Sequence, residues 1–371
     1  MSRLLILLFF LGCVSPSAYA ATLSDKPARP FLKDFNDAFV LPPGQLELSV
    51  DYLIMNDTVD VLDVRDDELR SVSEAFRDER VGDLYGASLH LNYGLFPSST
   101  LRFGYAYRDI ELSIANFKIH SLDFAWRQAL LRNADETFLV TLDAGLRLDR
   151  VPDQDFGDFD DIERLAQRID SRLRFDLSES ETHYLFERDG LIVGTPKSRG
   201  APEISLTRMR DLTPYVRLSA GGLLGPVSPS VFVEFGKSWI DSSVGTNFGV
   251  LFGSLAADRI PDDENLDREE TYWKAGWGIG FVPAPRLRGR LEYNYIRISR
   301  ENSLDFVNDN HLLRAELAYF VTDSLAIHLG GTYYRHLYNG VFPVLYNRFT
   351  QSGFDHDYGE LRVGFTYAFG R

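Results

Sequence analysis

The chain has 371 residues and a formal net charge of −15 at pH 7. So acidic a surface argues against a nucleic-acid partner, because binding to a phosphate backbone relies on Lys and Arg. Cys13 is the only cysteine, which excludes an intrachain disulfide and metal sites built from several thiolates. The mean hydropathy is −0.17. Beyond the N-terminus no apolar run approaches the ~20 residues of a membrane-spanning helix.

The N-terminus has the organisation of a secretory signal peptide. Arg3 provides the positive n-region, Leu4 to Gly12 form the apolar core, and Ala18-Tyr19-Ala20 is an A-x-A cleavage site. We expect cleavage after this tripeptide, which leaves residues 21–44 as a Pro-containing periplasmic lead-in. The alternative is a lipoprotein in which Cys13 is acylated.

From about residue 45 to the C-terminus, apolar and polar side chains alternate in segments of about ten residues. Clear examples are the segments 46–52, 273–281 and 361–369. A period of two places one set of residues on each face of a strand. Here one set is aromatic-rich, and the other contains Arg, Glu, His and Gly. This pattern is typical of a transmembrane β-barrel with an apolar outside and a polar lumen.

The alternating segments predict an all-β, antiparallel transmembrane barrel of about 12 strands. We expect the strands at about 45–55, 84–95, 100–111, 116–130, 136–149, 214–224, 230–240, 271–282, 286–298, 310–321, 324–336 and 358–369. Short turns alternate with long acidic loops, which predicts periplasmic termini and extracellular long loops. A count of fourteen is the alternative, with Ile169–Leu177 and Glu203–Arg210 as an extra pair.

Two local features are superimposed on this pattern. The segment at about 150–212 is too long for an ordinary connection, so it either folds inward as a constriction or caps the outside. Within it, Asp189-Gly190 predicts a hairpin tip. Between Lys118 and Phe124 the alternation changes phase, and we expect a β-bulge near His120-Ser121.

The polar set of each predicted strand gives the candidates for the lumen wall. They are Glu47, Asp51, Asp123, Asp143, Glu234, Glu292, Glu316 and Glu360, then Arg102, Arg108, Lys118, Arg127, Arg147, Lys274, Arg288, Arg290, Arg314 and Arg362, with His90, His120, His328 and Asn294. The two signs nearly balance. The lumen is therefore either closed by its own ion pairs or a narrow channel that selects anionic or zwitterionic solutes. For selectivity we single out Arg102, Arg108, Lys274, Arg288, Arg290, Glu292, Arg314, Glu316 and Arg362.

The excess negative charge lies in the predicted loops, at 57–68, 153–163 and 258–270. Carboxylates can bind divalent cations, and we expect the loops to contact outer-membrane lipid and lipopolysaccharide through such ions. We expect no cofactor. A different possibility is catalysis by residues at the rim of the last three strands, where His311, His336 and His356 lie. The chain contains no G-x-S-x-G or H-E-x-x-H sequence, so we assign no catalytic or metal-ligating residue.

The alternating strands resemble those of bacterial outer-membrane β-barrel proteins of the porin-like kind, over about residues 45–369. The lead-in Leu41-Pro42-Pro43-Gly44 is similar to the start of uncharacterised outer-membrane transporters linked by name to aromatic degradation. The last strand ends on Phe369, as the assembly signal of this class usually does, although Gly370-Arg371 follow it. The resemblance is architectural. It implies the outer membrane of a Gram-negative bacterium and the barrel assembly machinery as a partner.

The sequence thus favours an outer-membrane channel or transporter that passes small solutes through a charged lumen. Two other functions stay open: an occluded barrel with a structural or surface-interaction role, and a hydrolase sited at the rim.

Overall fold

The computed structural model describes residues 38–55, 81–112, 115–135, 137–156, 173–176, 183–188, 191–199, 203–248, 251, 263–300, 308–335, 343–345 and 357–369. The predicted signal peptide with Cys13 lies outside these residues. So do His336, His356 and much of the acidic loops. Among the described residues, no helix is both long and apolar enough to cross a membrane.

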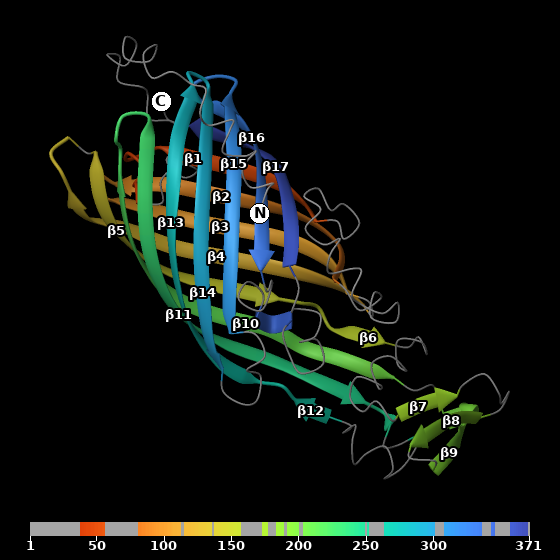
Figure 1. Ribbon diagram of the computed structural model, residues 1–371. Helices are drawn as coiled ribbons and strands as arrows, with labels where there is room; N and C mark the ends of the chain where they lie inside the picture. Colours follow the sequence, from red (N-terminus) through yellow and green to blue (C-terminus); the bar gives the residue numbers. More distant parts are fainter. Residues whose placement is uncertain are drawn as a thin grey trace, which may run out of the picture.

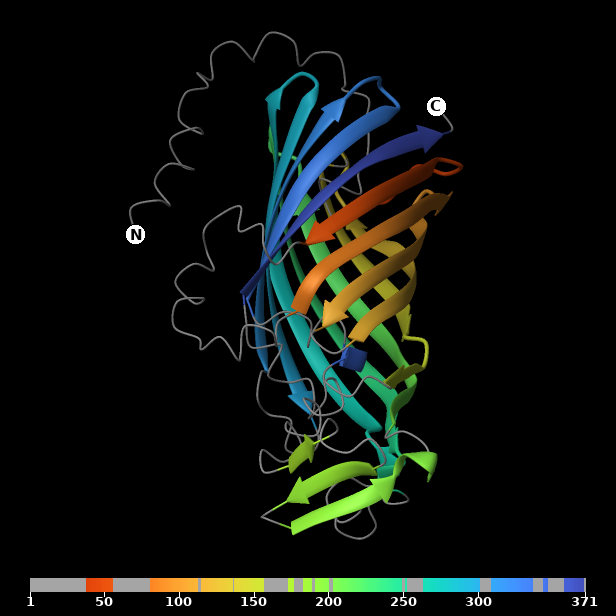
Figure 2. The same ribbon diagram turned by 90° about the vertical axis from the view of Figure 1, so that its right-hand side faces the viewer.

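Twelve antiparallel strands close into one barrel (Figure 1). They are β1 (Leu46–Met55), β2 (Val81–Phe96), β3 (Ser99–Leu112), β4 (Ala115–Arg132), β5 (Phe138–Arg150), β10 (Ile204–Gly222), β11 (Val227–Thr246), β13 (Arg268–Ala284), β14 (Leu287–Arg300), β15 (Asp309–Phe320), β16 (Leu325–Arg335) and β17 (Asp357–Phe369). Each pairs with the next barrel strand along the chain. The seam closes where β17 lies against β1, from Leu46↔Phe369 to Ile54↔Leu361 (Figure 2).

The twelve-strand prediction is therefore confirmed, and the alternative of fourteen is wrong. Glu203–Arg210 is not a separate strand, because β10 already begins at Ile204. Leu173–Asp176 forms β7, which belongs to a second sheet. Two short strands, β6 (Gln154–Phe156) and β12 (Asp263–Asn265), extend the pairing of β10 and β11 beyond the other strands.

Short turns join the strands at one end of the barrel, which we call the short-turn end. The long connections leave from the opposite, long-loop end. The second sheet, made of β7, β8 (His183–Arg188) and β9 (Leu191–Pro196) and followed by η2 (Lys197–Arg199), lies beyond the long-loop end of β10 and β11 (Figures 1 and 2). This sheet is outside the barrel, so this part of segment 150–212 is not an inward constriction. The predicted hairpin is present, since β8 pairs with β9 on either side of Asp189-Gly190.

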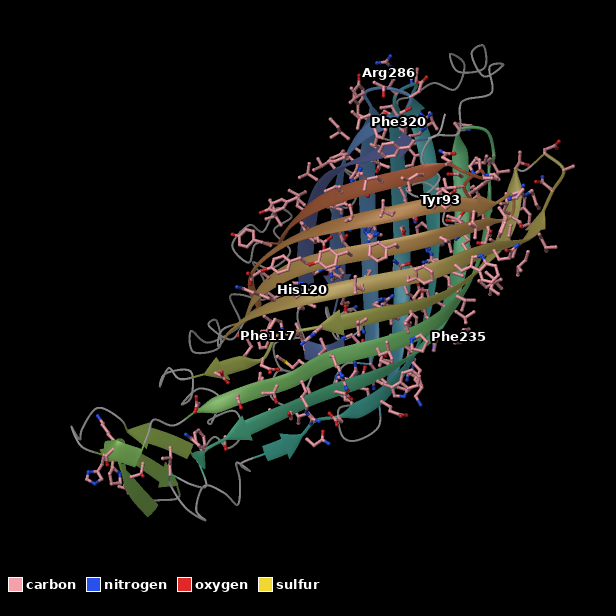
Figure 3. The ribbon with its side chains drawn as sticks, turned by 180° about the vertical axis from the view of Figure 1, so that it is seen from behind. Tyr93, Phe117, His120, Phe235, Arg286 and Phe320 are labelled. Atoms are coloured by element: carbon pink, nitrogen blue, oxygen red, sulfur yellow. The ribbon has the colours of Figure 1, made fainter. Side chains whose placement is uncertain are left out.

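Large apolar side chains cover the outside of the wall. Phe235 is 60% exposed and Trp126 is 49% exposed, and Tyr93 is exposed as well (Figure 3). The positions that alternate with such outward side chains along a strand carry polar, buried residues, for example Glu47, Ser49 and Asp51 on β1. This inside-out arrangement is what a hydrocarbon surrounding requires, because lipid takes the place of a protein core.

The change of phase in β4 is not a bulge. The β3–β4 pairing runs without a shift from Ser99↔Gln128 to Leu112↔Ala115. The inward face instead changes from polar to apolar towards the long-loop end, where Phe117 and Ile119 are buried. The outward face changes in the opposite sense. Lys118 and His120 lie on the outside, so predicting them in the lumen was wrong.

Candidate functional site: the charged lumen

All nine residues singled out for selectivity share the strand face that points into the barrel. Four of them form a compact group on β14 and β15. In the strand register Arg290 lies opposite Glu316, and Glu292 lies opposite Arg314. Arg290 also forms an ion pair with Glu292, and both side chains are less than one-tenth exposed. Arginines and carboxylates thus alternate in this group, and the wall here does not present charges of one sign.

Two further clusters continue this network around β16, β17 and β1. Arg362 Nη2 donates to Glu360 Oε1 at 3.1 Å, and Tyr334 Oη donates to Glu360 Oε2 at 3.0 Å. His328 Nε2 and Asp51 Oδ1 lie 2.5 Å apart. These last two side chains come from strands on either side of β17 and meet above Gly364.

The opposite wall carries the same kind of network. Lys274 lies opposite Glu234 in the register of β13 and β11. Glu234 also accepts a hydrogen bond from Tyr272 Oη at 2.8 Å and lies 3.9 Å from Arg217 Nη1. The Arg217 guanidinium stacks on the Phe232 ring, 3.6 Å from its centroid. Such pairs hold the wall rigid, since removing one partner of a buried ion pair costs about 3–5 kcal/mol.

A deeply buried ion pair joins β4 to β5. Asp143 is fully buried and accepts two hydrogen bonds from Arg127, from Nε and Nη2, both at 2.7 Å. Arg102 Nη1 adds a third at 3.0 Å. Neither Asp143 nor Arg127 was among the nine selectivity candidates, although both alternate correctly for the lumen. Whether Arg127 and Asp143 meet depends on the register between β4 and β5, which the sequence alone does not give.

Some charged groups stay accessible from within the lumen. The Arg147 side chain is 30% exposed and lies 3.7 Å from Asp123, which also accepts from Tyr215 Oη at 3.1 Å. The Arg102 side chain is 28% exposed. Two of the nine candidates occupy other surroundings. Arg108 donates to Ser121 Oγ at 3.3 Å, and Arg288 donates to turn carbonyls such as Leu287 O at the short-turn end.

The glycines on the inward face make room for neighbouring side chains rather than leaving open space. A Cβ added to Gly276 would lie 2.6 Å from the Phe232 ring. At Gly236 it would lie 2.5 Å from the Tyr272 ring. The side chains of one strand therefore lie flat over the glycines of the next, which fills part of the bore.

The lead-in enters the barrel at the short-turn end. Phe39 and Val40 are buried against Leu139, with Ala129 and Leu223 beside them. Arg127 Nη1 donates to Phe39 O at 3.1 Å, and the Leu41 amide donates to Thr100 Oγ1 at 2.8 Å. This segment thus lies across the mouth and is held there by the Arg127–Asp143 pair.

An apolar layer lines the long-loop end. It is formed by buried side chains on the inward face of several strands: Ile110, Phe117, Ile119, Met209, Ile240, Ile296, Ile298 and Leu312. At the same end lies η3 (Pro343–Leu345), whose three residues are buried. Although η3 belongs to the β16–β17 connection, it contacts β10 and β11 across the barrel (Figures 1 and 2). Arg268 Nη2 holds it by donating to Pro343 O at 2.5 Å.

The rim hypothesis concerns the histidines of the last strands. His311 lies on the outward face, with its Nδ1 2.7 Å from Tyr293 Oη and its ring 5.3 Å from that of Tyr295. His336 and His356 lie outside the described residues. Within the described part of the chain, no group of three or more His, Cys, Asp or Glu is arranged to hold a metal ion. Catalysis at the rim stays a prediction.

A closed antiparallel barrel with an aromatic-rich, apolar outside and a charged inside defines a transmembrane β-barrel of the outer-membrane type. No model of a known protein family matches the sequence, and no curated protein sequence matches it.

Several solved barrels are similar in structure. The NanC porin matches with 9% identity and a TM-score of 0.40, over 87% of this chain and 98% of that one. The translocator domain of the autotransporter NalP from Neisseria meningitidis gives 7% identity and a TM-score of 0.44, over 89% of this chain and 90% of that one. The Pseudomonas putida toluene transporter TodX gives 11% identity and a TM-score of 0.40, over 88% and 90%. At these sequence identities and TM-scores, the structural similarity gives no information about a solute for this chain.

Proposed function

We propose that this protein is an outer-membrane channel that passes small solutes through its charged lumen. The observation that carries the proposal is the chemistry of the inner wall. A barrel needs only to fill its bore to be stable, and apolar side chains would do so at lower cost than buried ions. Instead, the described strands place at least one charged side chain in the middle of almost every inward face. In this proposal the short-turn end faces the periplasm and the long-loop end faces the outside.

Selectivity would come from the charges that solvent can reach. Most inward arginines are neutralised by a carboxylate within hydrogen-bond distance, so they position one another more than they attract a solute. Arg102 and Arg147 also lie beside carboxylates, those of Asp143 and Asp123, but each arginine side chain is about one-third exposed, so solvent can reach it. A small anionic or zwitterionic solute passing them would exchange water for guanidinium contacts. Arg108, Lys274, Arg290, Arg314 and Arg362 would set the width of the path.

Two inserted segments would limit conduction. Phe39–Leu41 lies in the periplasmic mouth, and the apolar layer with η3 narrows the other mouth. A constriction lined only by apolar side chains holds water poorly, so ions and polar solutes cross it only while it is widened. We assign the gating role to these two segments instead of to β7–β9, because those strands lie outside the barrel.

Liposome swelling tests the proposal. The mature protein would be refolded into liposomes, and uptake of anionic, neutral and cationic solutes of similar size would be compared. We expect measurable uptake with a preference for anions, and a loss of that preference in Arg102→Gln/Arg147→Gln. Lys237→Gln is the matched control, because Lys237 lies on the outer face, paired with Glu269. Absence of uptake by a demonstrably folded barrel would refute the proposal.

An occluded barrel is the second candidate. The burial of side chains at both mouths favours it, and so do the rings that lie over the inward glycines. The two candidates differ in the swelling assay: an occluded barrel admits no solute, and its function would then reside in the long loops and the β7–β9 sheet.

A further inference from the structure

Three outward-facing side chains form a row across β4, β5 and β10 near the long-loop end. In the strand registers His120 lies opposite Arg150, and Arg150 lies opposite Arg210. All three are exposed, and the Arg210 side chain is 66% exposed. Directly opposed residues have Cβ atoms about 5 Å apart, so the three heads can converge on one small group. We call His120, Arg150 and Arg210 the cation row.

The next row towards the middle of the barrel is purely apolar. Leu122 lies opposite Leu148, and Leu148 lies opposite Leu212. These three leucines point outward and are 37–41% exposed. The cation row therefore borders the apolar belt directly, at the level where hydrocarbon gives way to lipid headgroups.

The charges of the cation row are incompletely balanced within the protein. Like charges directly opposite each other on neighbouring strands are destabilising. Asp241 forms an ion pair with Arg210 at 2.5 Å, at one end of the row. At the other end, Tyr105 Oη lies 2.9 Å from His120 Nδ1, and the neighbouring Tyr107 donates to Asp109. Among the described residues, none forms an ion pair with Arg150, in the middle of the row.

A similar arrangement on β14 and β15 has its own counter-ion. There His311 also lies beside two tyrosines, Tyr293 and Tyr295. The adjacent cation, Arg297, is held by both oxygens of Asp309, at 3.1 and 3.2 Å. The two sites share the Tyr-x-Tyr and His pattern but differ in whether a carboxylate neutralises the nearby guanidinium.

We propose that the cation row binds a phosphate group of lipopolysaccharide, with the acyl chains of that lipid lying along Leu122, Leu148 and Leu212. Arg150 and Arg210 supply charge-assisted hydrogen bonds to the phosphate oxygens, and His120 adds a third polar contact. The site belongs to the outer leaflet and thus depends on the orientation given under the proposed function, but not on conduction. It is distinct from the acidic loops, which would need a divalent cation to meet the same phosphate.

Binding of lipid A to the refolded full-length mature protein in detergent micelles tests this inference. Each basic residue near a charged lipid surface contributes about 1 kcal/mol, so we expect Arg150→Gln/Arg210→Gln to weaken binding by about thirtyfold. Arg297→Gln is the matched control, an outward arginine at the same end that already has its carboxylate. It should bind like the wild type. Slower migration of heated samples in gel electrophoresis verifies that each variant is folded, and Arg150→Gln alone serves if the double variant is not.

Dephosphorylated lipid A and inorganic phosphate complete the experiment. We expect dephosphorylated lipid A to bind the wild type about as weakly as lipid A binds the double variant. We expect millimolar inorganic phosphate to compete poorly, because it lacks the acyl chains. Equal binding by wild type and double variant, or equal binding of the two lipids, would overturn the assignment. Strong competition by inorganic phosphate would show a site for soluble phosphate and would also overturn it.

Discussion

Replacing Gly364 by Ala tests whether the contact between Asp51 and His328 across β17 supports the seam that closes the barrel. An added Cβ would lie 2.5 Å from His328 Nε2 and 2.8 Å from Asp51 Oδ1, and it would also collide with the Val50 carbonyl of β1. The backbone collision cannot be relieved by a side-chain rotation. The pair must therefore separate, and β1 must shift away from β17.

The magnitude follows from two terms. Overpacking a closely packed site costs about 1–3 kcal/mol, and losing a hydrogen bond to a charged group costs about 1.5–3 kcal/mol. We therefore expect Gly364→Ala to lower the free energy of unfolding by about 2.5–6 kcal/mol. With an m-value of ~2 kcal/mol/M, the urea midpoint falls by about 2 M. Tryptophan fluorescence of the barrel in lipid vesicles measures the transition.

Gly359→Ala is the control for this experiment. Gly359 lies on the same strand, and a Cβ added there would meet nothing within 4 Å. We expect the free energy of unfolding of this variant to stay within about 0.5 kcal/mol of wild type. If Gly364→Ala were equally stable, the meeting of Asp51 and His328 over β17 would not be a feature of the folded seam.

Three further predictions concern other parts of the wall. Asp143→Ala should lower the free energy of unfolding, measured by urea titration, by about 3–5 kcal/mol, because it leaves the buried guanidinium group of Arg127 without its carboxylate. A decrease of less than about 1 kcal/mol would contradict the buried pair. Arg127→Ala removes the donor to the Phe39 carbonyl, so protease cleavage of the lead-in should become faster than in wild type, whereas unchanged cleavage would place the lead-in's anchor elsewhere. Trp126 and Trp277, each studied as the only tryptophan, should be quenched strongly by brominated lipid acyl chains, and insensitivity to bromine would mean that these faces do not contact lipid.

The strand count was predictable because it depends on local patterns. Alternation of apolar and polar residues has a period of two, so a few residues are enough to recognise a strand. Turns such as Phe96–Ser99 interrupt the alternation and mark where one strand ends and the next begins. Strand ends were less predictable. We expected a strand at about 214–224, but β10 begins ten residues earlier, at Ile204. Pro214 stays opposite Leu146 in the pairing with β5, whereas the pairing with β11 is interrupted there, between Leu212↔Trp239 and Tyr215↔Gly236.

The lumen was predictable as a set of residues but not as a set of pairs. Alternation places Arg290, Glu292, Arg314 and Glu316 on the inward face. Which arginine meets which carboxylate depends on the register between strands. The apolar layer was not foreseen at all. Its only local signal is the change of phase at Phe117. The layer also includes η3, which begins more than two hundred residues later, at Pro343.

Single-channel recording in planar bilayers tests the central claim most directly. The refolded mature chain would be compared with a form that begins at Pro42 and thus lacks the segment buried in the short-turn mouth. We predict steady channels whose conductance is at least twofold larger in the shortened form, with anions preferred in both. Silent bilayers with both forms, each shown to be folded and inserted, would contradict a conducting lumen.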